Sequence, residues 1–126
     1  MFALPMAHIL VVEDETSLRA LLAEVLALDG HTVSTAEDGR AALQQLRRTR
    51  PEVILLDLLL PDTDGWTFAR QCQTDPVGRD IPILVVSVVN PQTVRRQLAG
   101  TGVRGALEKP FDFEQLLALV DATIRP

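Results

Sequence analysis

The sequence predicts a doubly wound α/β domain, in which a five-stranded parallel sheet carries helices on both faces. Short apolar runs rich in Val, Ile and Leu recur along the chain, and segments with apolar residues every three to four positions lie between them. Such runs are typical of parallel strands that are buried on both faces. Each crossover helix returns the chain to the same end of the sheet. Acidic and polar residues directly follow several of the runs, at the sheet edge where these folds bind ligands.

The five predicted strands are short enough to belong to one small sheet. None of the apolar runs approaches the roughly 20 residues that a membrane-spanning helix needs, so we expect no membrane insertion. Three runs are strongly apolar and two are weaker. The strong strands are predicted at 8–12, 53–57 and 81–87, and the weaker strands at 31–36 and 104–108.

The predicted helices alternate with the strands. Gly30 follows the first helix, as is common just beyond a helix end, and the chain enters the second helix through Asp38 and Gly39. Pro91 suits the first turn of the fourth helix, and Asp112 is positioned to cap the fifth. The predicted helices cover 18–26, 41–46, 67–73, 91–99 and 113–124, with loops at 61–65 and 74–82.

Length and composition predict one compact domain. The chain has 126 residues and 47% hydrophobic residues, enough to build a single core. We expect a short N-terminal arm at residues 1–7 and the folded domain at 8–126. The opening residues carry no basic segment and do not resemble a secretion signal.

Charge and cysteine usage exclude several classes of function. The net charge of −5 disfavours direct nucleic-acid binding, which depends on Lys and Arg neutralising phosphates. The single cysteine, Cys72, excludes a disulfide within this sequence, and a cytoplasmic location is expected. Two small arginine clusters are interpreted as solvated helix faces, with partner docking as the alternative. They comprise Arg47, Arg48 and Arg50, and Arg95 and Arg96.

Four conspicuous residues are expected to be structural. His8 and His31 lie at the beginnings of strands, on the rim opposite the strand-end acids. Trp66 is expected to pack at a helix start. Cys72 has no basic neighbour or second thiol that would indicate redox chemistry, so it is expected on a helix face.

Carboxylates at two strand ends predict a cation site. Glu13 and Asp14 follow the first strand, and Asp57 follows the third. Because an unpaired buried charge is costly, such groups normally find a partner or a metal. Mg²⁺ prefers oxygen ligands with one or two carboxylates and retained waters. Asp14 and Asp57 can supply the carboxylates, Glu13 can reach the ion through water, and the Leu59 backbone carbonyl can face it.

The same strand ends suit phosphoryl transfer. The Asp57 carboxylate can act as the nucleophile beside a metal. Ser87 and Lys109, which follow two later strands, offer a hydroxyl donor and a positive charge to the transferred group. Each of these residues alone is more often a cap or a turn residue. Their complementary chemistry at one edge of a sheet favours a functional site.

From about His8 to Ile124 the chain resembles the receiver domain of two-component response regulators. The resemblance rests on VVEDE, on EDGRAAL at the second helix, on DLLLPDTDG around Asp57, on Ser87 after the fourth strand, and on EKPF. It implies a flavodoxin-like (βα)5 fold with strand order 2-1-3-4-5. It also implies a signalling phosphoacceptor that is not an enzyme in the usual sense, although it assists its own phosphorylation and dephosphorylation.

The resemblance also implies a role for each site residue. Asp57 would accept the phosphoryl group from a sensor histidine kinase or a histidine phosphotransfer protein and would then signal to an unidentified downstream effector. Mg²⁺ would be held by Asp14, Asp57 and the Leu59 carbonyl, with Glu13 assisting. Ser87 and Lys109 would contact the phosphoryl group, and the bond between Lys109 and Pro110 would be cis.

The sequence departs from the family pattern at two places. Ala106 stands where many members carry an aromatic switch residue, so we expect signalling to depend less on the face formed by the fourth helix and fifth strand. Leu59 and Val89, which the resemblance places beside the phosphoryl group, are apolar and cannot orient an attacking water. We therefore expect slow loss of phosphate.

Two other interpretations of the fold are weighed. A small phosphohydrolase or phosphotransferase with Asp57 as nucleophile would need a general acid two residues on, where the chain has Leu59. A pseudo-receiver that binds without phosphorylation would have no need for the complete set of site residues.

Overall fold

The computed structural model describes residues 6–124. Most of the expected arm at residues 1–7, and the last two residues of the expected domain, lie outside that range. Ala7 is buried, and its backbone N–H donates to His31 Nδ1 at 3.2 Å. Its carbonyl accepts from Thr32 N at 3.0 Å. Ala7 is therefore packed against the sheet, and His31 has the structural role expected of it.

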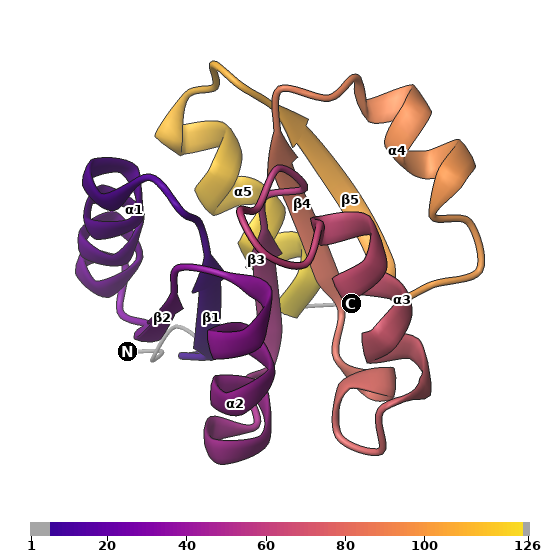
Figure 1. Ribbon diagram of the computed structural model, residues 1–126. Coiled ribbons are helices and arrows are strands. Elements are labelled where there is room, and N and C mark those ends of the chain that lie inside the picture. Colours follow the sequence, from indigo (N-terminus) through magenta and orange to yellow (C-terminus); the bar gives the residue numbers. More distant parts are fainter. Residues whose placement is uncertain (1–5, 125–126) are drawn as a thin grey trace.

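Five parallel strands form one sheet in the order 2-1-3-4-5 (Figure 1). The expected fold class and strand order are confirmed. The predicted strand boundaries agree with the observed ones to within two residues. The largest difference is at residues 81–82, because Pro82 has no N–H to donate to a neighbouring strand. The strands are β1 (His8–Val12), β2 (Thr32–Ala36), β3 (Val53–Leu56), β4 (Ile83–Ser87) and β5 (Val103–Glu108).

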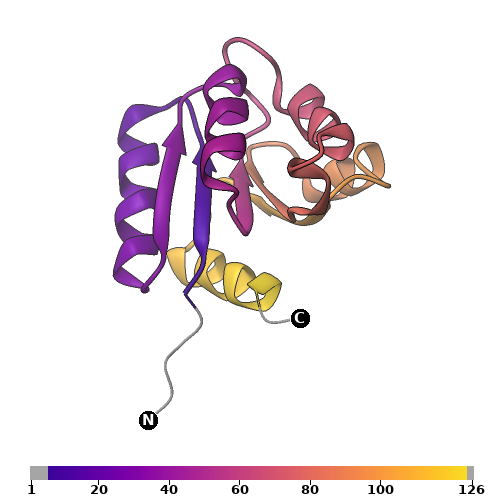
Figure 2. The ribbon, with the colours of Figure 1, turned by 90° about the horizontal axis from the view of Figure 1, so that it is seen from below.

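Helices cover both faces of the sheet (Figure 1, Figure 2). Two helices, α1 (Thr16–Leu28) and α5 (Phe113–Ile124), pack on one face. The other face carries α2 (Gly39–Thr49), α3 (Gly65–Thr74) and α4 (Pro91–Gln97). None of the helices in residues 6–124 is both long and apolar enough to cross a membrane.

Capping side chains set where the helices begin. Asp38 Oδ1 accepts from Ala41 N at 2.8 Å at the start of α2. The first helix begins at Thr16, two residues before its predicted start, because the Glu15 carboxylate accepts from Leu18 N. At α5 the contact is reversed from the expected cap: the Asp112 backbone N–H donates to Gln115 Oε1.

One short helix lies inside a segment that was predicted to be a loop. A single 3-10 turn, η1 (Gly78–Asp80), follows α3 within residues 74–82. Asp75 organises this turn, since its Oδ1 accepts from Val77 N at 2.9 Å and from Gly78 N at 3.1 Å. Three-residue turns of this kind leave no periodic pattern in the sequence.

Alternation along the strands builds two core layers. In β1, Leu10 and Val12 face the layer of α2, α3 and α4, whereas Ile9 and Val11 face the layer of α1 and α5. All four side chains are buried. Full burial of such a side chain contributes about 1.5–3 kcal/mol to the stability of the folded state. The two core layers therefore stabilise the sheet, and the polar residues lie at the ends of its strands.

We expect Asp75→Ala to lower the free energy of unfolding by about 2 kcal/mol, because it leaves the buried Gly78 N–H and the Val77 N–H without their acceptor. Arg47 Nη2 also donates to Asp75 Oδ2 at 3.0 Å, but its side chain is 62% exposed. Arg47→Ala should therefore cost only about 0.5 kcal/mol. Urea unfolding of both variants tests this ranking, and an equal loss in the two would contradict it.

The effect of Asp75 should depend on pH. Hydrogen bonds from Gly78 N and Val77 N hold the pKa of Asp75 below its usual value. A carboxylate with a lowered pKa stabilises the folded state above its unfolded pKa of about 3.9, and this contribution is lost as the pH falls through the folded pKa. The difference in the free energy of unfolding between wild type and Asp75→Ala should therefore be largest near neutral pH and should decrease below about pH 4.

Candidate functional site

Strand register brings two of the predicted acids together. Val12 pairs with Leu56 across the junction of β1 and β3, so the next residues, Glu13 and Asp57, leave the sheet side by side. Asp57 N donates to Val12 O at 3.0 Å, which extends the ladder to the acid itself. The position of this carboxylate is therefore fixed by the sheet.

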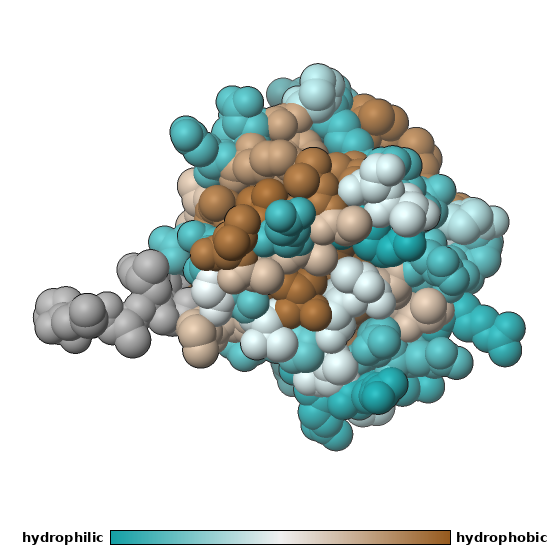
Figure 3. Space-filling view, turned by 90° about the vertical axis from the view of Figure 1, so that its left-hand side faces the viewer, coloured by the Kyte–Doolittle hydropathy of each residue, from teal (hydrophilic) through white to brown (hydrophobic). Residues whose placement is uncertain are grey.

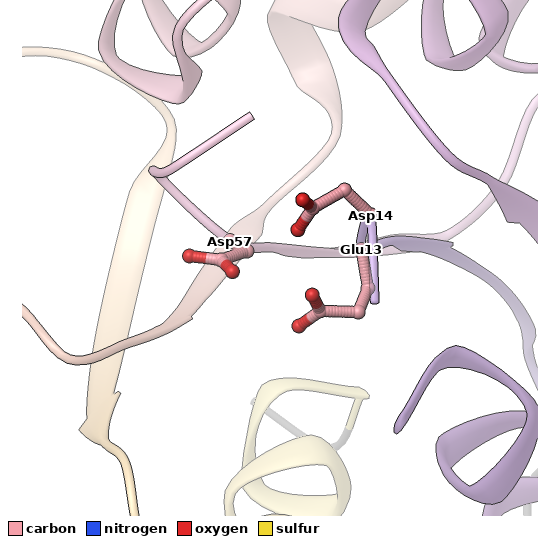
Figure 4. A group of neighbouring side chains, drawn as sticks. All are labelled: Glu13, Asp14 and Asp57. Atoms are coloured by element: carbon pink, nitrogen blue, oxygen red, sulfur yellow. The ribbon is translucent and has the colours of Figure 1, made fainter. Parts of the chain in front are cut away.

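Glu13, Asp14 and Asp57 form an acidic triad. Each offers one carboxylate oxygen, and these three oxygens lie within 4.8 Å of one another. Figure 4 shows the side chains of Glu13 and Asp14 extending toward Asp57. Glu13 and Asp57 are 2% and 6% exposed, whereas Asp14 is exposed. A cation or ligand can therefore approach the triad from the side of Asp14.

Lys109 joins the triad from the end of β5. Its Nζ donates to Glu13 Oε1 at 2.7 Å and to Asp57 Oδ2 at 3.0 Å. Burial opposes the charge, but the hydrogen bonds to Glu13 and Asp57 outweigh it and raise the pKa of Lys109. The bond between Lys109 and Pro110 is cis, as the resemblance implied. Lys109 is thus a fixed positive charge next to the Asp57 carboxylate.

Both oxygens of Glu13 are already hydrogen-bonded within the chain. Oε1 accepts from Lys109, and Oε2 accepts from Glu15 N at 3.1 Å. Burial, with a smaller contribution from the negative charge of Asp57, raises the pKa of Glu13 against the lowering effect of these bonds. Glu13 is therefore held in place through both of its carboxylate oxygens.

Both oxygens of the Asp57 carboxylate accept hydrogen bonds that fix its orientation. Oδ1 accepts from Leu59 N at 3.1 Å, and Oδ2 accepts from Lys109. The Leu59 side chain is 54% exposed, so the loop after β3 borders solvent. The expected role of the Leu59 backbone carbonyl as a Mg²⁺ ligand stays a prediction.

Ser87 is the last residue of β4 and is fully buried. Its carbonyl accepts from Lys109 N at 2.8 Å, which ties the ends of β4 and β5 together. Val89 N lies 3.5 Å from the Ser87 hydroxyl oxygen, a weak contact. The hydroxyl can therefore turn to another partner at little cost.

Two residues near the site were not predicted from the sequence. Arg19 Nη1 donates to the Glu13 carbonyl at 2.9 Å and to the Asp14 carbonyl at 3.3 Å, which holds the loop that carries both acids. Asp62 binds the N-terminus of α2 with both carboxylate oxygens. Arg19 contacts the loop five to six residues before it, and Asp62 contacts the first turn of a helix 22 to 23 residues away. The sequence signal for both is their position close to the acids.

The residues expected to be structural have structural contacts. His8 Nε2 is 2.6 Å from Ser34 Oγ, and Trp66 is partly buried against the core. Burial, followed by the nearby negative charge of Asp75, raises the pKa of the Cys72 thiol to about 12. Such a thiol is unreactive at neutral pH.

An apolar hollow of about 370 Å³ borders Lys109. Hydrophobic side chains gather on the face that contains α1, as Figure 3 shows. The rings of Phe111 and Phe113 stack edge to face, with centroids 5.9 Å apart. The hollow is lined by Leu18, Val88, Lys109, Pro110, Phe111 and Phe113.

Comparison with known proteins gives one consistent family. Residues 9–121 match the response regulator receiver domain. The chain is 37% identical over 118 residues to the response regulator MprA of Mycolicibacterium vanbaalenii, a match that covers 94% of this chain and 50% of that protein. It is 38% identical over 120 residues to the response regulator PleD of Caulobacter vibrioides, which covers 94% of this chain and 26% of PleD.

A solved structure agrees with these sequence matches. The fold is similar to that of the chemotaxis response regulator CheY4 of Vibrio cholerae, with a TM-score of 0.87 and 30% sequence identity. The match covers 94% of this chain and 99% of that one. In contrast, the chain spans half the length of MprA and about a quarter of PleD.

Proposed function

The chain belongs to the response regulator receiver domain family of two-component signalling proteins, and from this we propose that it is a phosphoacceptor whose acceptor residue is Asp57. The observation that carries the proposal is the position of the Asp57 carboxylate. It is almost fully buried at the end of β3, hydrogen-bonded to the Lys109 ammonium and grouped with two further carboxylates.

In the proposed reaction an Asp57 oxygen attacks the phosphorus of a phosphohistidine. The new O–P bond forms as the N–P bond breaks, and the leaving imidazole keeps the electron pair and takes up a proton. No group is oxidised or reduced. Lys109 and Ser87 supply a positive charge and a hydroxyl donor for the oxygens of the transferred group. By holding these donors, the chain assists its own phosphorylation and later dephosphorylation.

The donor set of the site fits a divalent cation. Three carboxyl groups lie beside one ammonium, and a divalent cation such as Mg²⁺ prefers oxygen ligands of this kind. We propose that Asp14, Asp57 and the Leu59 carbonyl hold Mg²⁺, with Glu13 reaching it through water. The bound ion would neutralise charge on the transferring oxygens.

We propose a sensor histidine kinase or a histidine phosphotransfer protein as the phosphodonor, and a separate effector that responds to the phosphorylated domain. The apolar hollow supports a protein phosphodonor, because it places hydrophobic contact area beside Lys109, the residue that hydrogen-bonds to the proposed acceptor carboxylate. The acidic net charge supports an output through protein contacts rather than direct nucleic-acid binding.

Intact-mass spectrometry after incubation with acetyl phosphate tests the proposed function. We expect a single phosphate adduct when Mg²⁺ is present and no adduct when the ion is removed with a chelator. A protein that stays unmodified at high Mg²⁺ concentration would instead support the pseudo-receiver interpretation.

Mg²⁺ should raise the melting temperature of the wild type, and Asp14→Asn should remove most of this response. At about 100 times its dissociation constant a ligand stabilises the folded state by about 2.7 kcal/mol, which is a shift of several degrees for a domain of this size. Thermal unfolding with and without Mg²⁺ measures the shift. Glu24→Gln, which removes an exposed carboxylate on α1 outside the triad, should respond like wild type. Equal shifts in all three proteins would place the ion elsewhere.

The phosphorylated state should be long-lived, and polar residues at two positions should shorten it. We expect Leu59→Asn combined with Val89→Glu to speed the loss of the adduct several-fold, because these side chains can orient an attacking water. The decay of the adduct mass over time gives the rate. Leu59→Ala with Val89→Ala is the control that removes the apolar bulk without adding polar groups. A lifetime as long as that of the wild type in the polar variant would contradict this explanation.

A further inference from the structure

The loop after Asp57 is attached to the N-terminus of α2. Asp62 Oδ1 accepts from Gly39 N at 2.8 Å, and Asp62 Oδ2 accepts from Arg40 N at 3.0 Å. The first four N–H groups of an α-helix have no partner within the helix. Asp62 therefore satisfies two of them from 23 and 22 residues away, while Asp38 satisfies a third, that of Ala41.

Close packing accompanies these hydrogen bonds. A Cβ atom at Gly39 would lie 2.9 Å from Thr63 Cβ and 3.3 Å from the Thr63 carbonyl oxygen. Only a glycine lets the loop approach the helix this closely without a shift. Burial opposes ionisation of Asp62, but the hydrogen bonds that its carboxylate accepts outweigh this effect and lower its pKa.

The loop is also fixed at its two ends. Leu59 N donates to Asp57 Oδ1 at 3.1 Å, and Gly65 N donates to the Leu58 carbonyl at 2.9 Å. Between these ends the Asp62 side chain hydrogen-bonds to another helix, α2. Pro61, the residue before it, restricts the backbone between Leu59 and Asp62.

We propose that Asp62 is a positioning residue that fastens the β3–α3 loop to α2 and thereby fixes the loop oxygens that bind the divalent cation. The inference rests on the proposed function, because it concerns the ligands that Asp57 and Leu59 supply. Side chains that orient the ligands of a metal typically change its affinity about 10- to 100-fold when they are replaced. Asp62 is exposed, so its removal leaves the core intact.

A Mg²⁺ titration followed by the fluorescence of Trp66 tests this role. Trp66 is the single tryptophan and follows the loop directly. We expect Asp62→Ala to bind Mg²⁺ about tenfold more weakly than wild type. Asp62→Asn should lie between the two, because its amide oxygen keeps one acceptor. The Mg²⁺-dependent shift in melting temperature gives a second readout that does not depend on the fluorophore.

Asp38→Ala is the matched control, since it removes one carboxylate and one capping bond from the same helix but leaves the loop attached. We expect its Mg²⁺ affinity to stay within about twofold of wild type, well below the change expected for a ligand-orienting residue. If Asp62→Ala and Asp38→Ala lose affinity equally, or if Asp62→Ala loses none, Asp62 is only a helix cap and the inference is wrong. If the wild type itself does not bind Mg²⁺, the proposed function fails first.

Discussion

Replacing Asp57 with asparagine is expected to abolish the phosphate adduct while leaving the domain folded. The amide oxygen has nearly the same size and position as the carboxylate oxygen but is not a nucleophile for phosphorus. The amide can still accept from Leu59 N, as Asp57 Oδ1 does. Lys109 keeps its 2.7 Å contact to Glu13, so its ammonium is not left buried and unpaired. Intact-mass spectrometry under the conditions that modify the wild type should detect no adduct.

Asp14→Asn is the control for the role of Asp57. It removes a carboxylate from the same acidic triad but keeps the nucleophile, so the adduct should form more slowly and still reach completion at high Mg²⁺ concentration. An adduct of the same mass on Asp57→Asn would show that another side chain is the acceptor. Loss of the adduct in both variants at every Mg²⁺ concentration would contradict the expected difference between the two carboxylates.

The main site residues could be predicted because parallel strands place their carboxyl ends at one edge of the sheet. Three of these residues, Glu13, Asp57 and Lys109, each come at the end of a predicted strand. In the structure the Lys109 ammonium donates hydrogen bonds to both Glu13 and Asp57. Strand order, by contrast, came from the resemblance to a family. Local apolar patterns identify strands but do not determine which strands are neighbours.

The supporting contacts could not be predicted from local sequence patterns. Arg19 and Asp62 contact backbone atoms whose positions depend on the paths of two loops. Helix starts were missed for a related reason: α1 begins at Thr16 through a Glu15 cap, although glutamate is not a preferred N-cap residue. Sequence patterns therefore predicted which side chains meet at this edge of the sheet, while the groups that hold them in place required the structure.

Gly65→Ala should be among the most destabilising single substitutions in the domain, with a loss of about 3 kcal/mol or more. Gly65 begins α3 directly against the end of β3. A Cβ atom there would lie 2.4 Å from Leu58 Cα and 2.6 Å from the Asp57 carbonyl oxygen. Both atoms belong to the backbone, so no side chain can rotate away and the strand end or the helix must shift. Urea unfolding measures the loss, and the variant should also bind Mg²⁺ more weakly because the displaced backbone carries Asp57.

Helix propensity predicts the opposite result, which makes this substitution a sharp test. Alanine is favoured over glycine within a helix by about 1 kcal/mol. Gly30→Ala is the matched control, since a Cβ there meets no atom within 4 Å but the backbone has φ +99°. Its cost should be limited to about 1–2 kcal/mol for that conformation. If Gly65→Ala costs no more than Gly30→Ala, the backbone around Asp57 yields easily, and the close contact between α3 and β3 does not fix the position of the Asp57 carboxylate.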